Sequence, residues 1–210
     1  MFSRIYEQYD DFLPDAHDVV YDVGAQFGDY ALICDKLYNA KVYAFEPLPI
    51  NHRRMTELHK MHGSRARLFS YAIGETHGKA DIYFSSDKTG STMMSKMQAM
   101  QAGSLRETVE FVSLDSFVES PDIEPPTLLK IDVEGYELDV IRGASKLISR
   151  FKPRIILEAH SSFLECNAIN LLLSAGYQKK HEGRRTSFPG VMDTVVNLFF
   201  APTNNSHRKV

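Results

Sequence analysis

A short apolar run at residues 19–23 leads directly into a turn that carries Gly24 and Gly28. Glycine has no Cβ, so the backbone can turn sharply there and a ligand can approach it closely before a helix begins. A second apolar run, residues 42–45, ends in Glu46, which lies 18 positions after Gly28. In a βαβ unit, an acidic residue about 20 positions after such glycines accepts hydrogen bonds from ribose hydroxyls. The two runs therefore predict a parallel sheet with a nucleoside site at one edge.

The turn departs from the pattern that binds a diphosphate. Residues 24–28 read Gly-Ala-Gln-Phe-Gly and lack the G-x-G-x-x-G order of a pyrophosphate-binding loop. Asp22, at the end of the strand, repels phosphate but attracts a cation such as the amino or sulfonium group of S-adenosylmethionine. Each half of the pattern alone fits a plain strand-to-helix turn equally well. Together the halves favour a site for a cationic nucleoside.

Composition limits the number of domains and the class of partner. A chain of 210 residues with 43% hydrophobic content is long enough for one well-buried core and scarcely for two. Its net charge of −3 gives no overall attraction to nucleic acid, so a nucleic-acid partner is not expected. Cys34 and Cys166 have neither metal-ligand spacing nor a disulfide pattern, and we recognise no signal peptide and no membrane span. These features lead us to expect a reduced, cytoplasmic enzyme.

Apolar strand-like runs alternate with helix-like segments, which is typical of an α/β sheet with helices on both faces. The expected strands lie near residues 19–23, 41–45, 67–72, 127–132, 154–159, 176–181 and 194–200. The helix after Gly28 is expected to bury one face, made of Tyr30, Ile33, Cys34 and Leu37.

We expect residues 17–202 to form a single domain, with an N-terminal extension at 1–16 and a flexible tail at 203–210. An insertion near 79–108 interrupts the alternation of strands and helices. It begins with a strand-like stretch and continues with three methionines at helical spacing, Met93, Met97 and Met100. Such a stripe suits either internal packing or a deformable lid over a substrate.

A second cluster of polar residues follows two later strands. Asp132 and Glu134 come directly after one apolar strand, and Glu158 and His160 end the next. Ligands of open α/β sheets lie outside the carboxyl ends of parallel strands, and alternation along a strand puts the members of each pair on one side. We therefore expect these four protonatable groups to converge beside the cofactor.

The cluster allows three roles, which the residues alone leave open. It can take a proton from a methyl acceptor, orient that acceptor by hydrogen bonds, or hold a divalent cation such as Mg²⁺. The candidate metal ligands are Asp132, Glu158 and His160, although their spacing forms no self-sufficient metal motif.

The chain resembles the FkbM-type S-adenosylmethionine-dependent methyltransferases over roughly residues 17–200. The resemblance rests on the order of five stretches, at 22–28, 45–47, 72–74, 113–115 and 130–135. It implies a Rossmann-like class I methyltransferase fold, with a seven-stranded, mostly parallel sheet, an antiparallel last strand and helices on both faces. It also implies O-methylation of a hydroxyl on a small molecule or sugar.

The resemblance also implies roles for single residues. Glu46 is similar to a ribose acceptor, and the backbone near Ala72 and Ile73 is expected beside the adenine, because no acid follows the third strand. The remaining residues expected against the cofactor are Asp22, Gly24, Ala25, Gly28, Pro47 and Asp132. In an in-line displacement, Asp132 or His160 would relieve the acceptor of its proton, with Glu134 and Glu158 beside them.

Three other functions are compatible with part of this pattern. An NAD-dependent oxidoreductase would use the same βαβ unit, but the altered glycines and Asp22 oppose it. A nucleic-acid methyltransferase is expected to carry an Asn- or Asp-Pro-Pro-aromatic turn after the fourth strand, where this chain has residues 132–135 instead. A noncatalytic S-adenosylmethionine-binding scaffold would keep Asp22 and Glu46 without needing the acidic cluster. The oligomeric state is not readable from the sequence.

Overall fold

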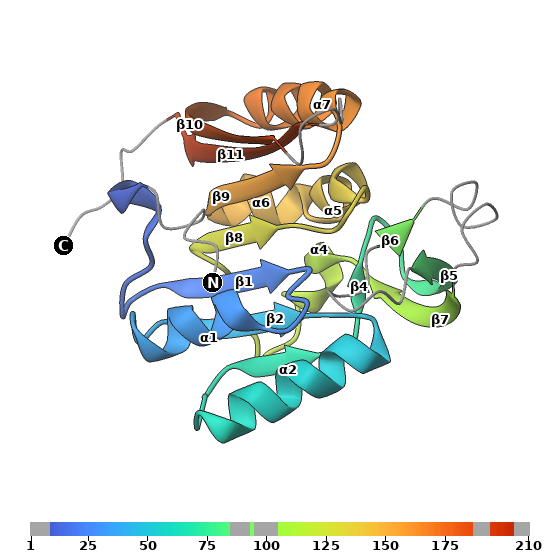
Figure 1. Cartoon of the computed structure of the whole chain (residues 1–210). Helices are drawn as coiled ribbons and strands as arrows, with labels where there is room; N and C mark the ends of the chain where they lie inside the picture. Colours follow the sequence, from blue (N-terminus) through green and yellow to red (C-terminus); the bar gives the residue numbers. More distant parts are fainter. Residues whose placement is uncertain (1–8, 85–92, 95–104, 187–193, 204–210) are drawn as a thin grey trace.

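The main sheet has seven strands in the order β10-β11-β9-β8-β1-β2-β3 (Figure 1). This computed structural model describes residues 9–84, 93–94, 105–186 and 194–203. The strands of the sheet are β1 (Val19–Val23), β2 (Lys41–Phe45), β3 (Arg67–Phe69), β8 (Leu128–Ile131), β9 (Arg154–Ala159), β10 (Tyr177–Thr186) and β11 (Thr194–Pro202).

Strand direction agrees with the sequence-based expectation. Each pairing among β3, β2, β1, β8 and β9 is parallel, whereas β11 is antiparallel to both β9 and β10. The predicted mostly parallel sheet with an antiparallel last strand is therefore confirmed. The carboxyl ends of β1, β2, β8 and β9 lie along one edge, where ligands of such sheets bind.

Helices cover both faces of the sheet. On one face lie α1 (Asp29–Lys36), α2 (Pro49–Met61) and a short 3-10 helix, η2 (Asp10–Phe12), packed on Val20 and Ile156. On the other face lie α4 (Leu114–Phe117), α5 (Glu137–Gly143), α6 (Ser145–Phe151) and α7 (Ser162–Ser174). Apart from Asp22 and Lys130, the central strands β1 and β8 present mainly apolar side chains on both sides, because each side is covered. Each buried Val, Leu or Ile side chain contributes about 1.5–3 kcal/mol.

A second sheet, with the order β4-β7-β5-β6, includes much of the stretch expected as an insertion near 79–108 and also residues 72–73 before it. Its strands are β4 (Ala72–Ile73), β5 (Gly78–Phe84), β6 (Met93–Met94) and β7 (Leu105–Val112). Figure 1 shows this sheet beyond the arrowheads of β1, β2 and β8, at the carboxyl edge of the main sheet. Met93 lies in strand β6, so the helix expected to carry the methionine stripe does not begin there. Met97 and Met100 lie outside the described residues, so the lid remains a prediction.

Two local predictions were wrong. The strand expected at 67–72 is divided, because Ala72 and Ile73 pair in parallel with β7 of the second sheet instead of continuing beside β2. Leu37 was expected on the buried face of α1 but is 73% exposed. That face instead passes through Asp35, whose carboxylate is held 2.7 Å from Arg65.

Cys34 of α1 and Phe12 near the N-terminus are both packed in the core. Cys34 is fully buried, as expected for a core residue. Part of the expected N-terminal extension belongs to the core, since Phe12 is 1% exposed and Tyr9 stacks on His181 with ring centroids 4.0 Å apart.

Within the described residues, no helix combines the length and apolar character needed to cross a membrane.

Candidate active site

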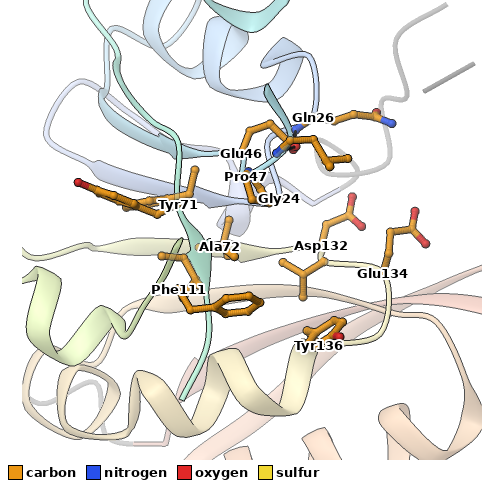
Figure 2. A pocket seen from close by; sticks show the side chains of 15 residues that line it. Gly24, Gln26, Glu46, Pro47, Tyr71, Ala72, Phe111, Asp132, Glu134 and Tyr136 are labelled. Atoms are coloured by element: carbon orange, nitrogen blue, oxygen red, sulfur yellow. Dashed lines mark hydrogen bonds between the residues drawn. The ribbon is translucent and has the colours of Figure 1, made fainter. Parts of the chain in front are cut away.

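A pocket opens at the carboxyl ends of β1, β2 and β8, with the second sheet on its far side (Figure 2). Its empty volume is about 680 Å³, part of which is open to solvent. Figure 2 shows Asp132 and Glu134 toward one end of the pocket and Tyr71 toward the other. The residues that line it are Val23, Gly24, Gln26, Phe45, Glu46, Pro47, Leu48, Tyr71, Ala72, Ile73, Phe111, Asp132, Val133, Glu134 and Tyr136.

Gly24 brings three strand ends together at the base of this pocket. Its φ of +79° lies in the left-handed region, and a Cβ at this position would overlap the backbone carbonyl of Asp132. The Gly24 amide donates to the carbonyl of Phe45 at 3.1 Å, while the Asp132 amide donates to Val23 at 3.0 Å. A bare backbone is therefore required where β1 passes between β2 and β8.

Two other residues of the turn lie away from the pocket lining. Gly28 begins α1 with a φ of +80°, and a Cβ there would meet the side chains of Met55 and His59. Ala25 is 7% exposed and packs in the apolar core beneath α1. Gly28 and Ala25 therefore shape the turn without lining the pocket. The residues of this turn that do line the pocket are Gly24 and Gln26.

Asp22 lies beneath the turn and is paired with a lysine. Its carboxylate Oδ1 is 2.8 Å from Nζ of Lys130, and the two residues are 0% and 3% exposed. Lys130 Nζ also lies 3.7 Å from Asp132. Burial alone would lower the pKa of Lys130, but the carboxylates of Asp22 and Asp132 raise it above its usual range. The structure thus places Asp22 outside the pocket lining, with its charge balanced by Lys130.

Glu46 lines the pocket at the end of β2 and is 5% exposed. Its carboxylate accepts hydrogen bonds from the amides of Gln26 at 3.0 Å and Leu48 at 2.9 Å, and from Asn51 Nδ2 at 3.3 Å. Burial raises its pKa to about 7, although these three donors oppose the shift. The side chain is held in one orientation by its neighbours, and Pro47 continues the same wall.

The four protonatable groups expected to converge do so around His160. Its Nε2 lies 3.3 Å from Glu134, 3.6 Å from Asp132 and 3.6 Å from Glu158. The nearest ligand atoms of Asp132, Glu158 and His160 are within 4.8 Å of one another, which is close enough for a shared cation. The structure therefore brings together all four residues of the predicted cluster, on the ends of β8 and β9.

A fifth member, Glu137, was missed by sequence reasoning. It is fully buried at the start of α5, and its Oε1 lies 2.6 Å from Nδ1 of His160. Acidic residues are common in the first turn of a helix, where they interact favourably with the helix dipole. The position of Glu137 in the sequence therefore gave no sign of a role in the site. Burial would lower the pKa of His160, but Glu137, Glu134 and Asp132 raise it to about 9. These carboxylates therefore favour the protonated form of His160 at neutral pH.

Sequence comparison links the chain to a family of methyltransferases. The model of the family described as "Methyltransferase FkbM domain" matches residues 22–179. The hexuronic acid methyltransferase AglP of Haloferax volcanii is 31% identical over 158 residues, which cover 75% of this chain and 62% of the relative. Methyltransferase 1 of Beauveria bassiana is 30% identical over 149 residues, which cover 62% of this chain and 59% of the relative. The chain thus spans about three fifths of the length of these curated relatives.

Solved structures agree on the fold. An FkbM methyltransferase from Methylobacillus flagellatus matches with a TM-score of 0.63 at 21% identity, covering 88% of this chain and 44% of that one. A precorrin-6y C5,15-methyltransferase from Geobacter metallireducens matches with a TM-score of 0.55 at 13% identity, covering 97% and 94%. These matches show a Rossmann-like class I methyltransferase fold. By the match of its sequence over residues 22–179, the chain belongs to the FkbM methyltransferase domain family.

Proposed function

We propose that this chain binds S-adenosylmethionine in the pocket and transfers its methyl group to a hydroxyl of a sugar or another small molecule. The observation that carries the proposal is the sign of the charge in the pocket. Its ionisable acids are Glu46, Asp132 and Glu134, and none of the described residues that line it is Lys, Arg or His. At about 4 Å, two unit charges near a protein surface interact by about 4 kcal/mol. A cationic sulfonium nucleoside therefore suits the pocket, whereas a diphosphate does not.

The two ends of the pocket suit the two ends of such a nucleoside. The wall made of Tyr71, Ala72, Ile73 and Phe111 is apolar or aromatic and fits a flat adenine ring. Glu46 lies between this wall and the acidic end, where its carboxylate can accept from ribose hydroxyls. Asp132 and Glu134 then stand beside the charged methionine portion. The residues present thus fit the group along its whole length.

When bound, S-adenosylmethionine supplies a methyl group activated by the sulfonium charge. The task of the protein is to hold an acceptor oxygen in line and to receive its proton. Asp132 is 22% exposed, lines the pocket and lies 3.6 Å from Nε2 of His160, so it can reach an acceptor. The carboxylates around His160 raise its pKa to about 9, which makes it a poor proton acceptor at neutral pH. Of the two candidate bases, we therefore assign proton removal to Asp132 and hydrogen-bond donation to His160.

The acceptor class rests on the named relative. The Haloferax volcanii protein is described as a hexuronic acid methyltransferase, which supports a search that begins with uronic acids and neutral sugars. Each acceptor is tested with and without Mg²⁺. The Mg²⁺ arm is included because ligand atoms of Asp132, Glu158 and His160 lie within 4.8 Å of one another.

The decisive experiment is calorimetric titration with S-adenosylmethionine, S-adenosylhomocysteine and NAD, using wild type, Glu46→Ala and a matched control, Glu57→Ala. Glu57 is exposed on α2 and does not line the pocket. Loss of hydrogen bonds to a charged group costs about 1.5–3 kcal/mol, so Glu46→Ala should weaken binding of the first two ligands about tenfold to a hundredfold. The control should bind as wild type does.

Two outcomes would contradict the proposal. Binding of NAD in place of S-adenosylmethionine would favour the oxidoreductase. Tight binding of S-adenosylmethionine without turnover across the whole acceptor panel would instead favour a noncatalytic scaffold.

A further inference from the structure

We propose that Glu137 is a positioning residue for methyl transfer, whose buried carboxylate fixes the His160 imidazole so that Nε2 faces the acidic end of the pocket. This inference rests on the proposed function, because it assigns His160 a task in orienting the acceptor. Glu137 does not line the pocket and is not expected to touch the cofactor.

The contacts of Glu137 join two walls of the site. Its Oε1 accepts from the amide of Gly135 at 3.1 Å and lies 2.6 Å from Nδ1 of His160. Gly135 belongs to the loop after β8, with a φ of +111°, whereas His160 follows β9. One carboxylate oxygen therefore ties the loop that carries Asp132 and Glu134 to the ring on the neighbouring strand.

Because Glu137 is buried, its carboxylate depends on His160 for compensation of its charge. The side chain is 0% exposed, and its other oxygen, Oε2, is buried without a hydrogen-bond partner among the described residues. A buried carboxylate requires a compensating charge or hydrogen bonds. The only cation that the described structure places against it is the imidazolium of His160. The Glu137 carboxylate therefore interacts mainly with the His160 ring.

The orientation of the ring leaves its second nitrogen for a ligand. A hydrogen bond from one imidazole nitrogen to a carboxylate fixes which nitrogen faces outward. The distances of 3.3 Å and more from Nε2 to Glu134, Asp132 and Glu158 exceed the roughly 3 Å of a normal N–H···O bond. The Nε2–H group thus lies near three carboxylates but is not within normal hydrogen-bond distance of any of them. It can therefore donate to the acceptor oxygen while Asp132 receives the proton.

Five charged groups set the environment of His160. Four are the carboxylates of Asp132, Glu134, Glu137 and Glu158, and the fifth is Lys130, which lies 3.7 Å from Asp132 and opposes them. Glu137 makes the shortest of these contacts. Removing its charge should change the His160 titration more than removing a distant acid does.

The first test needs no methyl acceptor. Histidine ¹⁵N and ¹H NMR signals are titrated in wild type, in Glu137→Gln and in a control, Glu165→Gln, with His160 assigned from the spectrum of His160→Gln. Glu165 lies on α7 and pairs with Arg184 at 2.8 Å, away from this cluster. An opposite charge in contact shifts a pKa by about 1–3 units, so the His160 midpoint should fall by about one unit or more in Glu137→Gln and stay unchanged in the control. Identical His160 titrations in wild type and Glu137→Gln would overturn the proposal.

The second test is kinetic and separates positioning from a purely structural role. Loss of an orienting partner typically costs about 10- to 100-fold in activity, so Glu137→Gln should lower kcat by that factor. Binding of S-adenosylmethionine by calorimetry should stay within about twofold, because Glu137 lies outside the pocket lining. In the double variant Glu137→Gln/His160→Gln, the Glu137 change should add almost nothing to the loss caused by His160→Gln. Independent, multiplying losses would contradict action through His160.

The NMR test and the kinetic test together distinguish failure of this proposal from failure of the proposed function. If no acceptor is methylated, the proposed function fails while the NMR arm still tests the Glu137–His160 pair. If Glu137→Gln does not fold, the wild-type spectrum decides, because a His160 signal that titrates at or below the usual pKa of about 6.5 would refute the pairing.

Discussion

Replacing Lys130 with methionine should destabilise the protein strongly, although Lys130 lies behind the pocket. Methionine keeps most of the side-chain length and removes the charge. Lys130 Nζ is 2.8 Å from Asp22 Oδ1, and the two residues are 3% and 0% exposed. Without Lys130, the carboxylate of Asp22 is left in the core with no compensating cation among the described residues. Breaking a buried ion pair from one side costs about 3–5 kcal/mol.

This loss of unfolding free energy corresponds to a decrease in Tm. For a domain of this length, 1 kcal/mol corresponds to about 2–4 °C, so Lys130→Met should lower Tm by about 6–20 °C. The double variant Asp22→Asn/Lys130→Met should recover part of that loss, because it leaves no uncompensated charge at position 22 in the core.

The assay is thermal and urea denaturation of wild type, both single variants and the double variant. The double-mutant cycle should give a coupling energy of about 2 kcal/mol or more between the two positions. A Lys130→Met variant within about 1 kcal/mol of wild type would refute the reasoning. A double variant no more stable than Lys130→Met would do the same.

Four further predictions follow from individual contacts. Gly143→Ala should lose about 1–3 kcal/mol in thermal denaturation, because the new Cβ would overlap the carbonyl of Gly74. Glu46, with its pKa raised to about 7, is largely neutral at pH 6 and ionised at pH 8, so affinity for S-adenosylmethionine should rise about tenfold over that interval by calorimetry, but not in Glu46→Gln. The pKa of His160 is raised to about 9, so its stabilising contribution is fully present below pH 6.5 and lost as pH rises through 9. The stability deficit of His160→Gln, measured by urea denaturation, should therefore shrink between those pH values and not grow. Asp132→Asn should lower the single-turnover rate of methyl transfer about a hundredfold to ten-thousandfold, whereas binding of S-adenosylmethionine should weaken by a much smaller factor, because Glu46 and Glu134 still line the pocket.

The parts of the fold that repeat a local pattern were predictable. Apolar runs separated by helical segments are local signals, and they predicted where the strands of the main sheet lie. The antiparallel direction of the last strand was implied by the resemblance to a known family, and it too is confirmed. The division of the 67–72 strand was not predictable, because it depends on β7, which lies about 40 residues later in the chain and competes for Ala72 and Ile73. Pairing partners far apart in sequence leave no periodic signal at either place.

The candidate site divides in the same way. The sequence by itself determined which residue types stand at the strand ends, including Gly24, Glu46 and the pairs that begin at Asp132 and Glu158, because a strand end is marked by local chemistry. Only the tertiary structure decided how their charges combine. It buried Asp22 against Lys130, 108 positions away, and placed Glu137 on His160, 23 positions away. The charge that a carboxylate presents to a ligand depends on the cation that folding places beside it, and that distance is set by packing of the whole sheet.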